Sequence, residues 1–415
     1  MAAPVEPIRP AATADPSLLR ILAALLVTGV CGYALLRAGV EELATPAGQW
    51  DFEVYYYALK VRDAGGNPWD HAQLVRAAGG AVHHLNYPPH VLPFFRLFYF
   101  DDLQLSKQVF LAAKLAVLAA LLTLWLRAFI PAGFRGWFLA FAALGFNAAL
   151  ARDLVVGNIS IFEQALIWFG LYALLRRRPL VFVTLITLAG QAKVLPLALL
   201  ALVLAADVPH RGRWFLGGVG GCGLIALAVY LAWPEETRYY LALQAAVGMM
   251  EPGSPLNPCL RALVQDLIQA AQPALPVLQG RRAADLALPV YAAAAAVIVA
   301  ATVWAIRRGR DPLWAWYLGL CGYALTVPRM KDYSFILLLV PVFELLRPRL
   351  TGSPSGRGLA VGILAVLAAP GTDMLWEYRP LLLAGWAWAV SLHPPAGPEA
   401  GPRGERGGSG GSPLG

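Results

Sequence analysis

Residues Leu286–Ile306 read LALPVYAAAAAVIVAATVWAI, and Arg307-Arg308-Gly309-Arg310 follow at once. A helix needs roughly 20 apolar residues to cross the hydrocarbon core of a bilayer, so this run is long enough to span a membrane. Under the positive-inside rule, the arginines mark the cytoplasmic end of such a helix. The stretch therefore predicts a transmembrane helix together with its orientation.

The rest of the chain repeats this design, with further long apolar runs at Leu115–Trp125 and Trp214–Leu231. Only 14% of the 415 residues are charged and 58% are hydrophobic, whereas a soluble domain averages about a quarter charged. The runs lack the period-2 alternation of a membrane β-barrel. We therefore predict an all-α polytopic membrane protein. The net charge of +8 comes from basic residues that flank apolar runs, so we expect no nucleic-acid partner.

The turns between the runs alternate in character. Every second turn carries arginine: Arg127/Arg135, Arg176–Arg178, Arg211/Arg213, Arg307–Arg310 and Arg347/Arg349. The others carry polar motifs: Asp51–Tyr56, Tyr87–Pro89, Gly157–Ser160, Gln191–Lys193 and Pro328–Tyr333. If the arginine turns are cytoplasmic, the polar motifs gather at the opposite membrane face. This pattern predicts a multi-pass membrane protein with an active site on the external, periplasmic side. The Ala/Arg/Gly-rich composition, without a visible organelle signal, suits a bacterial plasma (inner) membrane.

Residues 17–392 are expected to form a bundle of about 11–12 membrane helices, some short or broken, between disordered tails at 1–16 and 393–415. The first external loop (39–102) should hold interfacial helices at Val54–Ala64 and Pro93–Phe100. The second (233–285) is expected to be short and polar and to form part of a lid. The predicted spans cover residues 17–38, 103–127, 136–152, 159–175, 213–232, 287–306, 312–327, 333–347, 357–369 and 379–392.

The apolar stretch 179–207 allows two interpretations. A single span would place Arg211 and Arg213 on the external side. Two short helices broken at Gly190–Pro196 keep those arginines inside, and broken backbone is tolerated at membrane depth where it lines a cavity. We favour the hairpin.

Asp51 is the candidate general base, since a carboxylate in an apolar shell near the membrane surface can accept a proton from a hydroxyl. Its alternative role is to cap a helix that begins at Phe52. Lys193 stands within the 179–207 run, where an ammonium is expensive and could bind a lipid phosphate, unless it snorkels to the interface. For Lys114 we expect snorkelling.

Arg329 and Lys331 form the only basic cluster among the short turns predicted to be external. The planar guanidinium of arginine and the point charge of lysine both suit a phosphate. By default Asn158 and Ser160 cap a helix, and Tyr87–Pro89 makes a rigid return to the membrane. The histidines at 71, 83, 84 and 90 should face water. No metal-ligand spacing exists, so neither a metal nor a cofactor is expected. Further candidates for substrate binding are Glu53, Tyr56, Tyr87, Asn158, Gln191, Asn257, Arg261, Asp332 and Tyr333.

Six short motifs in order resemble glycosyltransferase family 87: DFEVYYYA followed by GGNPWD, then NYPP, GNIS, QAKVLP and PRMKDY, between about residues 50 and 345. The resemblance implies a GT-C fold related to polyprenyl-phosphate-mannose-dependent mannosyltransferases. It further implies inverting transfer of a hexose, mannose in the family, to a glycolipid or glycan acceptor. The family's base falls by position on Asp51 and its lipid-phosphate contacts fall on Lys193, Arg329 and Lys331. The segment around Asn257 departs from the family's Asn-x-Ser pattern.

Two rival functions stay open. A transporter or flippase of lipid-linked sugars would distribute polar residues through the membrane depth, whereas here they collect on one face. A member of the family without activity would only bind a lipid-linked sugar.

Overall fold

The computed structural model describes residues 48–250, 257–275, 282–309, 311–351 and 377–392. Helices and loops make up all of these ranges, with no strand among them, which confirms the all-α prediction. The predicted spans 17–38 and 357–369 and both predicted tails lie outside the described residues.

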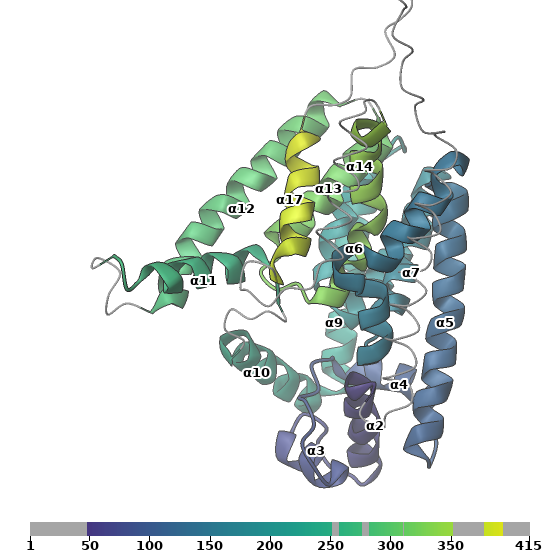
Figure 1. Ribbon diagram of the computed structural model, residues 1–415. Coiled ribbons are helices and arrows are strands. Elements are labelled where there is room, and N and C mark those ends of the chain that lie inside the picture. Colours follow the sequence, from purple (N-terminus) through teal and green to yellow (C-terminus); the bar gives the residue numbers. More distant parts are fainter. Residues whose placement is uncertain (1–47, 251–256, 276–281, 310, 352–376, 393–415) are drawn as a thin grey trace, which may run out of the picture.

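Three of the described helices are long and apolar enough to cross a membrane: α5 (Leu103–Ala128), α9 (Arg211–Ala232) and α12 (Ala283–Arg308). A fourth, α6 (Arg135–Val156), qualifies only as a broken span, because it bends by 56° along its length. Figure 1 shows α5 flanking one side of the bundle and α12 leaning away on the other. The core between them includes α7 (Ser160–Leu175), α13 (Pro312–Thr326), α14 (Leu339–Thr351) and α17 (Arg379–Val390).

The 179–207 stretch is broken, as the hairpin interpretation predicted. Helix α8 (Pro179–Ala192) ends before Lys193, whose backbone is extended, and the 3-10 helix η4 (Leu195–Ala205) packs back against α8. Gly190 makes this close return possible, because a side chain there would collide with Leu197. The second arm is a 3-10 helix, which the sequence did not predict.

The segment predicted as the first external loop builds a second hydrophobic core together with Phe110 of α5 and Ile159. Helix α2 (Trp50–Asp63) buries Phe52, which stacks on Phe110 with ring centroids 4.6 Å apart, and Tyr55, which stacks on Phe95 at 3.8 Å. Residues 93–100 do not form the single interfacial helix we expected. They divide between α4 (Leu92–Phe95) and the 3-10 helix Arg96–Phe98; Phe95 and Phe98 are buried in this core, whereas Phe100 is exposed.

The segment predicted as the second external loop (233–285) is not the short polar segment expected from the sequence. It contains the helices α10 (Pro234–Met250) and α11 (Leu260–Ala271). Proline at the first position and Glu235 and Glu236 in the first turn are typical signals for the start of a helix, and they begin α10. In Figure 1, α10 lies beneath the bundle near α2.

Candidate active site

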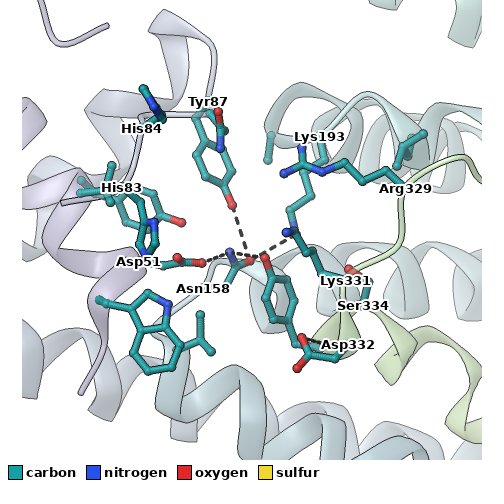
Figure 2. A pocket seen from close by; sticks show the side chains of 18 of the residues that line it. Asp51, His83, His84, Tyr87, Asn158, Lys193, Arg329, Lys331, Asp332 and Ser334 are labelled. Atoms are coloured by element: carbon teal, nitrogen blue, oxygen red, sulfur yellow. Dashed lines mark hydrogen bonds between the residues drawn. The ribbon is translucent and has the colours of Figure 1, made fainter. Parts of the chain in front are cut away.

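A cavity of about 580 Å³ opens where the polar motifs of the sequence meet. Its walls come from the start of α2, the 83–87 segment, the junction of α6 and α7, the break at Lys193, the 329–334 segment and α10. Figure 2 shows Asp51 and His83 on one side of this cavity and Lys193 and Arg329 on the other. Its polar lining residues are Asp51, Tyr55, His83, His84, Asn86, Tyr87, Arg152, Asn158, Lys193, Tyr240, Gln244, Arg329, Lys331, Asp332, Tyr333 and Ser334.

The position of Asp51 depends on a close backbone contact between α2 and the end of α6. Gly157 ends α6 in the left-handed conformation (φ +72°), and a Cβ there would lie 2.8 Å from Cβ of Gln49. The backbone N–H of Gln49 also donates to the carbonyl of Val155 at 2.7 Å. Glycine is required at 157 both by its φ and by this approach. The contact places Asp51 beside Asn158.

Asp51 does not cap α2. The helix starts at Trp50 with Gln49 in the cap position, so Asp51 lies inside the first turn and its side chain does not cap the helix. Instead its Oδ2 accepts a hydrogen bond from Nδ2 of Asn158 at 2.6 Å. Burial raises the pKa of Asp51 above its ordinary value, although the Asn158 bond and the charges of His83 and Lys193 oppose this shift. A desolvated carboxylate of this kind is a better proton acceptor than one in water.

Lys193 lies in a network of hydrogen bonds and an ion pair rather than snorkelling. Its ammonium donates to Oγ of Ser160 at 2.6 Å and to Oδ1 of Asn158 at 3.2 Å. It also pairs with Glu163 at 2.9 Å, and it lies 5.4 Å from the ring centre of Tyr333. The network holds the ammonium at the cavity wall, and it explains why α7 carries a buried glutamate.

Arg329 and Lys331 lie on a segment that two contacts hold to residues 257–259. Asn257 Oδ1 accepts the backbone N–H of Met330 at 2.7 Å, and the Cys259 thiol donates to the carbonyl of Pro328 at 3.1 Å. Both basic residues line the cavity, together with Lys193. The structure thus brings three cations from two distant parts of the chain to one cavity with Asp51.

Of the residues predicted to bind substrate, Tyr87, Asn158, Asp332 and Tyr333 line the cavity. The other five do not, and their positions differ from the prediction. Glu53 pairs with Lys107 at 2.6 Å, and the Tyr56 hydroxyl donates to the carbonyl of Asp101 at 2.8 Å. Gln191 donates to its own helix at Thr187, Asn257 anchors Met330, and Arg261 lies on α11 outside the lining.

Several cavity residues were missed by sequence reasoning. His83 and His84 were expected to face water; His83 is exposed and His84 half-buried, and the sequence did not show that both line the cavity. His84 lies against His71 with ring centroids 3.9 Å apart. Burial lowers the pKa of His84, and the charges of the nearby His71 and His83 lower it further. Arg152 pairs with Asp332 at 3.1 Å. Its only signal in the sequence was a charge near the end of a predicted span.

The expectation that Lys114 snorkels is wrong. Lys114 and Asp153 are both fully buried, and the ammonium lies 2.7 Å from Oδ2 of Asp153. The pair joins α5 to α6 one turn before Gly157. Asp153 stands four residues before the turn predicted at Gly157, and nothing in the sequence indicated that it would pair with Lys114 on the preceding helix.

The arginine turns gather away from the cavity. Arg177 pairs with Asp207, which joins the Arg176–Arg178 turn to the turn before Arg211. Arg347 lies 5.2 Å from the ring centre of Phe134, so it lies beside the Arg127/Arg135 turn. Helix α6 carries Arg135 at its first position and the cavity residues Arg152 and Val156 near its other end. This separation of basic turns and cavity was predicted from the alternation of the turns.

The profile of glycosyltransferase family 87 matches residues 85–328, more than half of the chain. Tyr87, Asn158 and Lys193 fall inside the match, whereas Asp51 precedes it and Arg329 and Lys331 follow it. No curated protein and no solved structure matched the chain in the corresponding searches. On the strength of the family match, and with its long apolar helices, the chain belongs to glycosyltransferase family 87 and is a membrane glycosyltransferase.

Proposed function

We propose that this protein transfers a hexose, with mannose as the first candidate, from a polyprenyl-phosphate donor to a hydroxyl of a glycolipid or glycan. The reaction takes place with inversion, at the external face of a bacterial inner membrane. The observation that carries this proposal is the shared cavity, in which one carboxylate, Asp51, faces the cations Lys193, Arg329 and Lys331.

Each side of the cavity suits one half of such a transfer. The donor's phosphate would contact the three cations, which favour the negative charge that grows on it as its bond to the anomeric carbon breaks. On the opposite side, Asp51 would take the proton of the acceptor hydroxyl while its oxygen bonds to the same carbon. Attack from the side opposite the leaving group inverts the configuration of that carbon.

The proposal needs no metal ion, because the cations supply the positive charge near the leaving phosphate. Protonated lysine and arginine side chains at fixed positions act on a phosphate in the same electrostatic sense as a bound metal. The apolar faces of the surrounding helices would hold the polyprenyl chain in the bilayer. The separation of the arginine turns from the cavity supports an external site through the positive-inside rule.

Purified protein incubated with radiolabelled polyprenyl-phosphate mannose and a panel of glycan and glycolipid acceptors tests the proposal. We expect a labelled product with the opposite anomeric configuration from the donor. Donor uptake into proteoliposomes without any glycosylated product would favour a transporter instead. Retention of configuration in the product would refute the direct displacement.

A further inference from the structure

We propose that Asn158 is the positioning residue of this site: it holds Asp51 by one carboxylate oxygen and so selects the other as the proton acceptor. The inference rests on the proposed function for the meaning of that proton transfer. The contacts that carry it belong to Asn158 itself and do not depend on which sugar is transferred.

The orientation of the Asn158 amide is fixed by its neighbours. Its Oδ1 faces four donors: the Ser160 N–H at 3.1 Å, the Ser160 hydroxyl at 2.8 Å, the Lys193 ammonium at 3.2 Å and the Tyr87 hydroxyl at 3.5 Å. The Ser160 N–H and the Lys193 ammonium can only donate, so the atom that faces them is the oxygen and the NH₂ group points the other way. There it meets Asp51 Oδ2 at 2.6 Å and the Tyr333 hydroxyl at 3.2 Å.

This geometry distinguishes the two oxygens of Asp51. Oδ2 is engaged by a short bond from the neutral Asn158 amide, whereas Asn158 makes no such bond to Oδ1, and the Asp51 side chain lines the cavity. A hydrogen bond to the charged form favours the carboxylate. The amide thus counteracts part of the effect of burial, and it keeps Asp51 ionised and ready to accept a proton.

Other groups around Asp51 act at longer range and cannot replace this bond. Several titratable groups interact electrostatically with the Asp51 carboxylate. They lie on α2, α5, α6, the 83–87 segment, the break at Lys193 and the 329–334 segment. In that order they are Tyr55, Lys114, Asp153, His83 and Tyr87, Lys193, and Tyr333. Removing the amide also removes its contacts with Lys193 and Tyr333, but it leaves the side chains of all these groups in the protein.

The test is an infrared titration of the carboxyl groups of the purified protein, in which subtraction of an Asp51→Asn variant isolates the Asp51 band. In Asn158→Leu we expect the pKa of Asp51 to rise by about one to two units, the usual worth of a hydrogen bond to a charged group. Gln164→Leu is the matched control, because Gln164 is a buried amide of α7 that does not line the cavity. It should leave that pKa unchanged.

Asn158→Ala provides a second variant in case the leucine variant does not fold, since it adds neither bulk nor charge beside Asp51. An upward shift of the Asp51 pKa is again expected. An unchanged Asp51 pKa in the folded variants would overturn the inference. The titration needs no turnover, so its result is independent of the transfer assay. An unchanged pKa would refute the role of Asn158 even if the wild-type protein transfers sugar. A failed transfer assay would refute the proposed function even if the pKa shifts.

Discussion

Replacing Lys114 by methionine should destabilise this protein strongly. The substitution keeps the length and most of the volume of the side chain, so packing between α5 and α6 is nearly preserved. What it removes is the partner of Asp153, which lies fully buried 2.7 Å from the ammonium. The carboxylate would then be left without a counterion in the interior, or would have to bind a proton.

Breaking one partner of a buried ion pair costs about 3–5 kcal/mol, because the remaining charge stays desolvated. Replacing both partners by apolar groups of similar size is often nearly neutral. We therefore expect the double variant Lys114→Met, Asp153→Leu to recover most of the loss. Since 1 kcal/mol corresponds to about 2–4 °C in domains of 150–250 residues, the single variant should melt at least about 5 °C below wild type.

Tryptophan fluorescence during heating in detergent provides the assay, since Trp125 and Trp168 are fully buried in the bundle core. Lys107→Met is the matched control, two turns earlier on α5. Its partner Glu53 is 25% exposed, so water can solvate the carboxylate that the substitution leaves behind. The reasoning would be refuted if Lys107→Met lowered the melting temperature as much as Lys114→Met, or if the double variant were no more stable than the single one.

Further predictions concern the cavity itself. Asp51→Asn should lower the rate of sugar transfer by about 10²–10⁴ with donor binding retained; near wild-type turnover would exclude Asp51 as the base. Since burial raises the pKa of Asp51 above 3.8 and only the carboxylate accepts a proton, activity should rise with pH to a half-maximum above pH 3.8; a pH–rate profile checks this. Lys193→Met should weaken binding of a polyprenyl phosphate in a filter assay, whereas exposed Lys60→Met should not; equal binding by both would contradict a phosphate site. Arg152→Met removes the partner of Asp332 and should lower turnover at least about tenfold by misplacing the 329–334 segment; rescue by Arg152→Lys would support this charge-pairing role.

The sequence determined the helical membrane class and much of the order of the helices. Both follow from local features: the length of an apolar run decides whether it can cross a bilayer, and arginine at its ends decides its direction. The break at Lys193 was equally local, because glycine, lysine and proline stand together there. Placing the polar motifs on one face needed only the alternation of the turns.

Tertiary structure alone decided which polar residues share the cavity. Glu53 and Asp51 are two residues apart on α2, yet Glu53 turns to Lys107 while Asp51 meets Asn158. Side chains two residues apart on a helix point to different sides, but the sequence does not show which residues pack on each side. Likewise Lys114 found Asp153 because α5 and α6 pack together, and pairing between helices depends on packing rather than on local pattern.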